Sequence, residues 1–97
     1  MGIKAIMETR EVVGYYQLAA GDMAAAISVP GTGSAVTIQA EAQNVRYRAD
    51  GEDPTNTVGV LLAAGESHTL MVGNGNIQTI RVIQAAGGAI LNVTTFK

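Results

Sequence analysis

Apolar and polar side chains alternate most regularly between residues 35 and 42. The apolar side chains occupy one face of an extended chain: Val36, Ile38, Ala40 and Ala42. The polar side chains occupy the other face: Thr37, Gln39 and Glu41. Because successive side chains of a strand point to opposite faces, this pattern predicts a strand with one buried and one solvated face. Such strands are typical of antiparallel sheets.

Shorter β-rich runs on both sides of this segment predict a chain made mostly of strands. The runs cover residues 12–18, 23–29, 45–48, 58–63, 67–72, 77–85 and 89–96. Turn residues separate them roughly every 8–12 residues, which is the spacing of a sandwich or a small barrel. We therefore expect a single all-β domain over residues 1–97, an antiparallel β-sandwich or small barrel with a jelly-roll-like arrangement.

The run at residues 23–29 allows a second interpretation. It is rich in alanine, which favours a helix, but it is short and Pro30 and Gly31 follow it directly. A strand is the preferred interpretation.

Glycine and asparagine residues predict the irregular points of the sheets. Gly14 marks a bulge in the first run, and a change of phase at residues 43–44 predicts a second bulge. The sequence Gly-Asn-Gly-Asn at residues 73–76 is a strong hairpin signal. We expect the runs 77–85 and 89–96 to pair with each other as the last two strands.

The first 14 residues fit this pattern least well. Ile3, Ile6 and Met7 have helical spacing, but the apolar run ends quickly and no capping residue is evident. We expect an extended arm or an edge strand rather than a helix. An apolar arm without a place in its own sheet is a candidate contact to a neighbouring subunit or to a larger shell.

Residues 44–59 join two predicted strands through a stiff polar turn, around which the rest of the chain is arranged. Val45 and Tyr47 point to one face of the incoming strand, and Arg46 and Arg48 point to the other. The segment predicts a hairpin or an arch. The segment contains no recognisable catalytic motif.

Four residues are candidates for a structural role in this turn: Asp50, Gly51, Pro54 and Gly59. Asp50 and Gly51 end the strand, and we expect Gly51 to adopt a positive φ there. Pro54 stiffens the turn because its ring fixes its own φ. Gly59 is the last residue of the turn segment and lies within the next apolar run, which starts at Val58.

The arginines and the acidic residues of the turn allow two interpretations. In the first, Arg46 and Arg48 form local ion pairs with Asp50, Glu52 or Asp53, each worth about 0–1 kcal/mol where exposed. In the second, they form a charged patch that binds another protein or a carboxylated sugar through paired hydrogen bonds. Local ion pairs are the preferred interpretation. The acidic residues lack the spacing of a calcium-binding loop.

Composition excludes several classes of function. The chain has 97 residues, six Lys or Arg and a net charge of −2, without the basic cluster of a nucleic-acid-binding protein. It has no cysteine and a single histidine, His68, so we expect no metal site, no cofactor and no catalytic triad. We expect His68 to lie at the surface or in an interface, and we expect no enzymatic activity.

The same composition bears on location and assembly. No run approaches the ~20 apolar residues of a membrane span and no signal-peptide pattern is present, so we expect synthesis in the cytoplasm and no membrane contact. Aromatic residues make up only 4% of the chain, so a small core must be built from aliphatic side chains. Because short strands also leave open edges, we expect a homo-oligomer.

The sequence resembles a group of small proteins encoded by tailed bacteriophages. The likeness covers about residues 35–96 and is carried by AVTIQAEAQNVRYRADG at 35–51, Asp-Pro-Thr at 53–55, VGVLLAAGE at 58–66, IRVIQAA at 80–86 and AILNVT at 89–94. The first third of the chain matches only loosely, and the family has no catalytic motif to transfer.

The resemblance implies a virion structural protein, in particular a capsid decoration or cement protein. The implied partners are the major capsid protein or other virion proteins, and the implied location is the capsid surface. A trimer is favoured over a dimer because shells offer three-fold sites. The alternative is a module of the tail or a fibre that binds host carbohydrate or another tail protein.

Overall fold

The computed structural model describes residues 11–73 and 76–97. This part of the chain contains eight strands: β1 (Val12–Leu18), β2 (Ile27–Ser28), β3 (Ala35–Glu41), β4 (Val45–Arg48), β5 (Val60–Leu62), β6 (Ser67–Met71), β7 (Arg81–Gln84) and β8 (Ile90–Phe96). It also contains two short 3-10 helices, η1 (Ala20–Met23) and η2 (Ile77–Thr79). The predicted arm contacts Ile3, Ile6 and Met7 lie outside the described residues.

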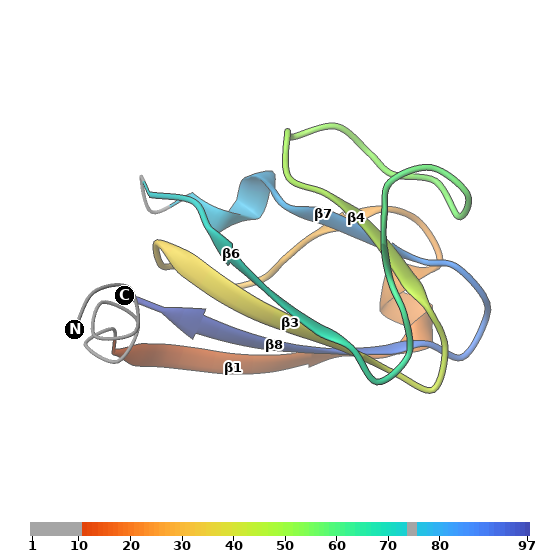
Figure 1. The fold of residues 1–97 in the computed structure, drawn as a ribbon, viewed down its shortest axis with the longest axis horizontal. Coiled ribbons are helices and arrows are strands. Elements are labelled where there is room, and N and C mark those ends of the chain that lie inside the picture. The colour runs from red at the N-terminus through yellow and green to blue at the C-terminus, as the bar shows by residue number, and fades with distance from the viewer. Residues whose placement is uncertain (1–10, 74–75) are drawn as a thin grey trace.

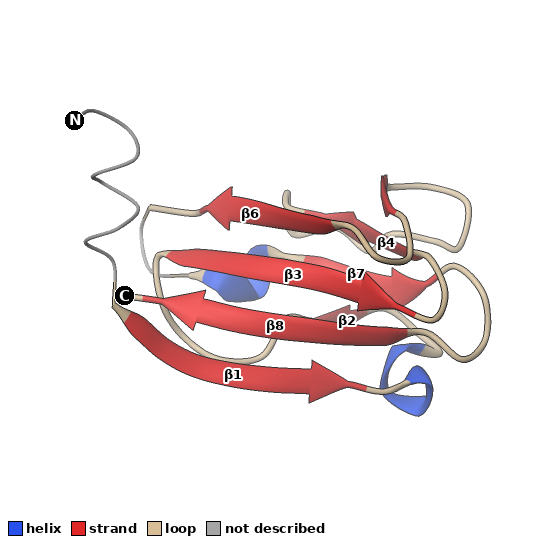
Figure 2. Cartoon of the chain, turned by 60° about the horizontal axis from the view of Figure 1, so that its bottom comes forward, coloured by secondary structure: helices blue, strands red, loops and turns tan. Residues whose placement is uncertain are grey.

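The strands form two four-stranded antiparallel sheets packed as a sandwich (Figures 1 and 2). The first sheet has the order β1-β8-β3-β6, and the second has the order β2-β7-β4-β5. Every chain connection crosses from one sheet to the other except the one between β4 and β5. This order is that of a jelly roll, in which two Greek keys give two four-stranded sheets. The all-β, jelly-roll-like prediction is confirmed.

The core lies between the two sheets and consists mainly of aliphatic side chains. Val36, Ile38 and Ala40 of β3 face inward and are fully buried, as their alternation predicts. Facing positions of the second sheet are buried with them, including Val45 and Val82. The remaining core members are Leu18, Met23, Val29, Tyr47, Leu62, Ile77, Ile80, Ala89, Leu91 and Val93.

The chain leaves the first sheet directly after β3, where a bulge was predicted. Ala42 is exposed and has a φ of +70°, so it does not continue the buried face of β3. Residues 43–44 carry the chain into the second sheet rather than inserting an extra residue into one strand. The change of phase in the sequence therefore marks a crossing between sheets, and the bulge prediction is wrong. The predicted bulge at Gly14 is present, because the register of β1 against β8 shifts there.

Two predicted strand pairings are also wrong. β6 belongs to the first sheet and β7 to the second, so these two strands do not pair as the predicted hairpin requires. β7 and β8 likewise lie in different sheets and do not pair. Local turn signals show where a chain reverses, but they do not show whether the next strand joins the same sheet.

Two of the predicted strands are shorter than expected, and each of these runs begins in a 3-10 helix. Only Ile27 and Ser28 of the run 23–29 form a strand, while Met23 ends η1 and is fully buried. The Asp22 carboxylate accepts a hydrogen bond of 2.9 Å from the Ala19 backbone N–H, which closes this turn. The run 77–85 similarly begins with η2.

Candidate functional site

The connection between β4 and β5, residues 49–59, lies against the outer face of the second sheet and is called the cover loop here. Figure 1 shows this loop on the side of β4 and β7 that faces away from β8. Gly51 has a φ of +86°, as expected where Asp-Gly ends a strand, and its backbone N–H donates to the Thr79 carbonyl at 3.1 Å. The Pro54 side chain is buried. The loop is therefore a packed part of the fold.

Three arginines of the second sheet hold the cover loop. Arg48 donates to the Asp50 carboxylate, with Nε 3.0 Å from Oδ1. Arg46 donates from Nη1 to the Gly59 carbonyl at 3.0 Å. Arg81 on β7 donates from Nε to Asp53 Oδ1 at 2.8 Å. Arg81 also donates from Nη1 to the Ser28 hydroxyl at 2.9 Å, so it joins the loop to β2 as well.

The ion pairs differ from the expected set in two ways. Arg46 forms no ion pair with a described carboxylate, and its Nε is buried without a hydrogen-bond partner. Asp53 pairs with Arg81, which lies directly opposite Arg48 in the register of β4 and β7. Sequence analysis missed Arg81 because it lies 28 residues from Asp53 and only the strand register brings the two together.

The Arg48–Asp50 pair stabilises the charged form of both groups. The hydrogen bond from Arg48 lowers the pKa of the Asp50 carboxyl, and the same bond raises the pKa of Arg48. Both side chains are exposed to solvent, at 35% and 54%, so the pair fixes the end of β4 more than it stabilises the whole fold.

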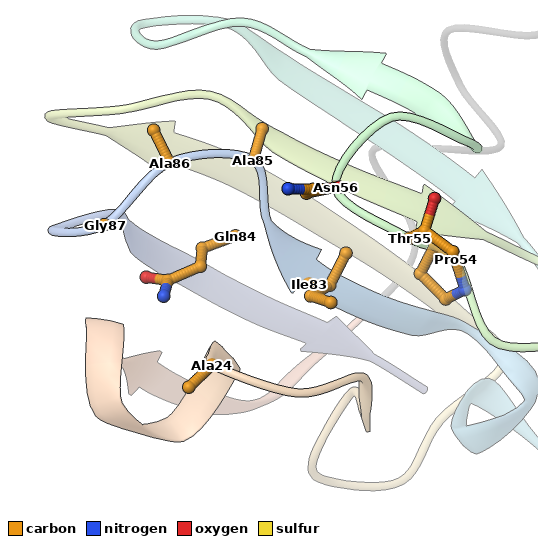
Figure 3. Close-up of a pocket in the computed structure, with 9 residues that line it drawn as sticks. All are labelled: Ala24, Pro54, Thr55, Asn56, Ile83, Gln84, Ala85, Ala86 and Gly87. Atoms are coloured by element: carbon orange, nitrogen blue, oxygen red, sulfur yellow. The ribbon is translucent and has the colours of Figure 1, made fainter.

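A cavity of about 340 Å³ lies between the cover loop, β7 and the residue after η1 (Figure 3). The cover loop contributes Pro54, Thr55 and Asn56, and Figure 3 shows Ala24 and Gln84 on the opposite side. The rest of the wall comes from Ile83, Ala85, Ala86 and Gly87. None of the nine lining side chains is ionisable.

Gln84 stands out among the lining residues. Its Oε1 atom is buried and accepts no hydrogen bond, which is unusual because buried polar atoms are nearly always paired. Asn56 is exposed at the opposite wall, and its carboxamide forms no hydrogen bond with the described residues. The sequence gives no signal for either residue, since an amide becomes a candidate only when its partners are known.

The outer face of the first sheet presents a contrasting cluster of polar side chains. Asn92 on β8 accepts hydrogen bonds from Tyr15 at 2.6 Å and from Gln17 at 3.0 Å. It donates to Gln39 at 3.3 Å and to the Glu41 carboxylate. The amide groups of this face therefore satisfy one another across three strands.

His68 links the two sheets at one side of the sandwich. Its Nδ1 atom lies 2.8 Å from the Tyr47 hydroxyl, and the two rings meet edge to face at 5.7 Å. Tyr47 is only 5% exposed, and burial raises its pKa. His68 is half-buried, and its neighbours do not supply a metal site: the described residues hold no group of three or more His, Cys, Asp or Glu that could bind a metal ion.

Comparisons with family models, with curated proteins and with solved structures give no match to this chain. None of its helices, over the residues that the structure describes, is long and apolar enough to cross a membrane.

Proposed function

We propose that this chain is a structural protein of a tailed-phage virion and that it decorates the capsid by binding the major capsid protein. The resemblance of residues 35–96 to small virion proteins supports this proposal. A jelly roll is compatible with it, because viral capsid domains use this architecture, but the same architecture also serves lectins and cupins. The function must therefore be inferred from the surface of the sandwich and not from its architecture.

The observation that carries the proposal is the apolar open edge of the second sheet. β5 pairs only with β4, so its other edge is unpaired within the described residues. Three side chains at this edge are strongly exposed, Val58 at 53%, Val60 at 49% and Leu61 at 42%. A groove of about 310 Å³ lies beside them and is also lined by Arg48 and Asp50.

An open strand edge with apolar side chains is a site for adding a strand from another protein. Backbone hydrogen bonds would align the added strand, and the groove would take up its side chains. Monomeric proteins usually protect such edges with lysine, proline or a bulge, and β5 has none of the three among Val60–Leu62. A segment of the capsid protein is the proposed occupant.

A second apolar edge supports self-association. β1 is an edge strand of the first sheet and exposes Val12, Val13, Tyr15 and Tyr16. β1 lies at the lower side of the sandwich in Figure 2, whereas β4, the neighbour of β5, lies at the upper side. Because the β5 edge is assigned to the capsid protein, the β1 edge is the surface left for contacts between copies of this chain. We propose a homo-oligomer on the capsid surface, with a trimer favoured and a dimer next.

Binding to capsid shells tests the proposal. Purified chain is sedimented with shells assembled from the major capsid protein of the phage that encodes it, and saturable binding is expected. Val60→Lys should weaken binding at least tenfold, while Ser67→Lys on the exposed edge strand β6 should leave it unchanged. Absence of binding by the unmodified chain, or its recovery only with purified tails, would contradict decoration.

Light scattering tests the oligomer separately. The monomer has a mass of 10.0 kDa, and a mass near that value at micromolar concentration would show that the chain does not self-associate.

The second candidate function is a binding module of the tail or a fibre. The observation that favours it is the open cavity of about 340 Å³ under the cover loop, whose lining side chains are all uncharged.

A further inference from the structure

The outer face of the first sheet changes from polar to apolar along its strands. The strand register arranges the side chains of this face in rows that cross β1, β8, β3 and β6. Two of these rows are mainly polar: Gln17, Asn92, Gln39 and Ser67 in one, and Tyr15, Thr94, Thr37 and Thr69 in the next. The third row lies at the end of the sheet where β1 begins, is apolar throughout and is called the terminal row here: Val12, Phe96, Ala35 and Met71.

The terminal row lies outside the core. Its members Ala35 and Phe96 are the strand neighbours of Val36 and Thr95, which are fully buried between the sheets. Because side chains alternate along a strand, Ala35 and Phe96 point away from the core. Both ends of the row are open, since Val12 is 60% exposed and Met71 is 52% exposed. Exposed apolar side chains that form one continuous stripe indicate a contact surface, whereas scattered ones do not.

The segment of the chain nearest to the terminal row is residues 1–10, which lie outside the described residues. This segment joins the described chain at Glu11, whose carbonyl accepts a hydrogen bond of 2.8 Å from the Lys97 backbone N–H. It therefore starts beside the end of β8, next to the terminal row. Its sequence contains three large apolar side chains: Ile3, Ile6 and Met7.

The length of this segment is sufficient to cross the sheet. Neighbouring strands lie about 4.8 Å apart, so the terminal row is about 14 Å long from β1 to β6. Ile3 precedes Glu11 by eight residues, and an extended chain of eight residues spans up to about 26 Å. A segment that turns back at the start of β1 can therefore reach Met71. Its attachment also favours its own sheet over that of another copy, because it gives a local concentration on the order of millimolar.

We propose that residues 1–10 pack across the terminal row of their own chain, with Met7 near Phe96 and Ile3 near Met71. The apolar side chains of the segment then bind their own sheet and not a neighbouring subunit or a shell. The terminal row contains no charged side chain, which suits an apolar segment. This surface is distinct from the open edge of β5, so the inference does not depend on capsid binding.

Oxidation of Met71 by hydrogen peroxide tests the contact. Each of the four methionines falls in a different tryptic peptide, so mass spectrometry follows them separately. In the double variant Ile3→Asp with Ile6→Asp, oxidation of Met71 should be at least about threefold faster, because its thioether loses its cover. Lys4→Gln changes a polar residue of the same segment and should leave the rate unchanged. Met23 is fully buried and should stay reduced in every variant, which shows that the fold is intact.

Cysteine pairs test whether the contact lies within one chain. The chain has no cysteine, so any disulfide comes from the introduced pair. Ile3→Cys with Met71→Cys should form a disulfide within one chain, which migrates as a monomer on a non-reducing gel. The matched control combines Ile3→Cys with Ser67→Cys, on the same face of β6 but about 14 Å further along the strand. This control pair should form the disulfide at least about tenfold more slowly.

Three results would overturn the inference. The first is an unchanged rate of Met71 oxidation in the double aspartate variant. The second is a disulfide that joins two chains, since the segment would then dock on a second copy. The third is equally fast disulfide formation by the two cysteine pairs, which a segment without a fixed site would give. Each experiment uses the free protein, so its result is independent of whether the chain binds capsid shells.

Discussion

The outward-facing polar side chains of the two sheets obtain their hydrogen bonds in different ways. On the first sheet, polar side chains of neighbouring strands bond to one another, with Asn92 at the centre and Thr37 paired with Thr69 at 2.8 Å. On the second sheet, the outward positions mix charge with apolar groups, since Arg46 lies opposite both Ile83 and Leu61. This mixed face is covered by residues 49–59, which the arginines hold in place.

The difference shows where unsatisfied groups collect in a small sandwich. A face of short polar side chains closes its hydrogen bonds locally and needs no cover. A covered face requires a loop with its own geometry, and the fit between loop and sheet is incomplete: it leaves a cavity and a buried Nε on Arg46 without a hydrogen-bond partner. Within the described residues, the buried side-chain atoms without a hydrogen-bond partner both belong to the second sheet.

The largest effect is expected where the cover loop meets the sheet most closely, at Gly59. Gly59 has a φ of +131°, and a Cβ at this position would lie 3.0 Å from the Tyr47 carbonyl oxygen and 3.1 Å from the Pro54 Cβ. Gly59→Ala should lower the free energy of unfolding by about 2–3 kcal/mol, because backbone strain and close contact add together. Urea denaturation measures this change.

Gly51→Ala is the matched control for Gly59→Ala. Gly51 also has a positive φ, +86°, but a Cβ there meets no atom within 4 Å. Only the conformational penalty remains, so we expect a loss of about 1 kcal/mol. Equal losses for the two variants would show that the loop does not pack tightly against the sheet.

The next largest effect is expected for Arg81, which connects the cover loop to β7 and β2. Its side chain is 29% exposed and Asp53 is 63% exposed, so solvent reduces the strength of the pair. Arg81→Met should still lower the free energy of unfolding by about 1–2 kcal/mol, since the bond to Ser28 is lost as well. Hydrogen exchange at the Gly51 amide should become faster as the loop loosens.

The ion pair between Glu11 and Lys97 provides the control on the first sheet. Its side chains are 75% and 74% exposed and the charged atoms are 3.6 Å apart. Glu11→Gln should leave stability and the Gly51 exchange rate unchanged within error. If Arg81→Met behaves in the same way, the arginine does not anchor the loop.

The fold could be predicted from the sequence to the level of its class. Alternation identifies β3 and its buried face, and spaced turn signals identify most of the other strands. What periodicity cannot reveal is which sheet each strand joins, because that depends on contacts between distant residues. The shift of phase at residues 43–44 and the Gly-Asn signal at 73–76 both mark passages between sheets, and each was interpreted as a feature within one sheet.

Only those contacts of the candidate site that join residues close in sequence could be predicted. Asp50 follows Arg48 by two residues, so their ion pair can be inferred from the sequence alone. The pairing of Arg81 with Asp53 depends on the register of β4 against β7. The cavity amides Asn56 and Gln84 depend on how the cover loop folds back, and no pattern in the sequence records that.

A smaller effect is expected on the first sheet, at the centre of its polar face. Asn92→Ala removes four side-chain hydrogen bonds, more than Arg81→Met does. These bonds lie on an exposed face, however, and water replaces them, so we expect a loss of only about 0.5–1 kcal/mol. A loss above about 2 kcal/mol in the free energy of unfolding, measured by urea denaturation, would show that this face contributes as much to stability as the covered one.

The smallest effect concerns acid. The Arg48 hydrogen bond lowers the pKa of the Asp50 carboxyl below its ordinary value of 3.8 in the folded protein. A group whose pKa is lower when folded stabilises the fold above its unfolded pKa, and this contribution disappears as the pH falls through the folded value. The difference in stability between the unmodified chain and Asp50→Asn should therefore be constant above about pH 5 and shrink below it. Thermal unfolding of both proteins across this range measures the difference, with Glu52→Gln as the control, because the Glu52 carboxylate accepts no hydrogen bond from the described residues. Since the Arg48 and Asp50 side chains both reach solvent, we expect this change in stability to be smaller than that caused by any variant of the packed residues of the cover loop. If the stability of Asp50→Asn still falls with acid as that of the unmodified chain does, another carboxylate causes the acid dependence.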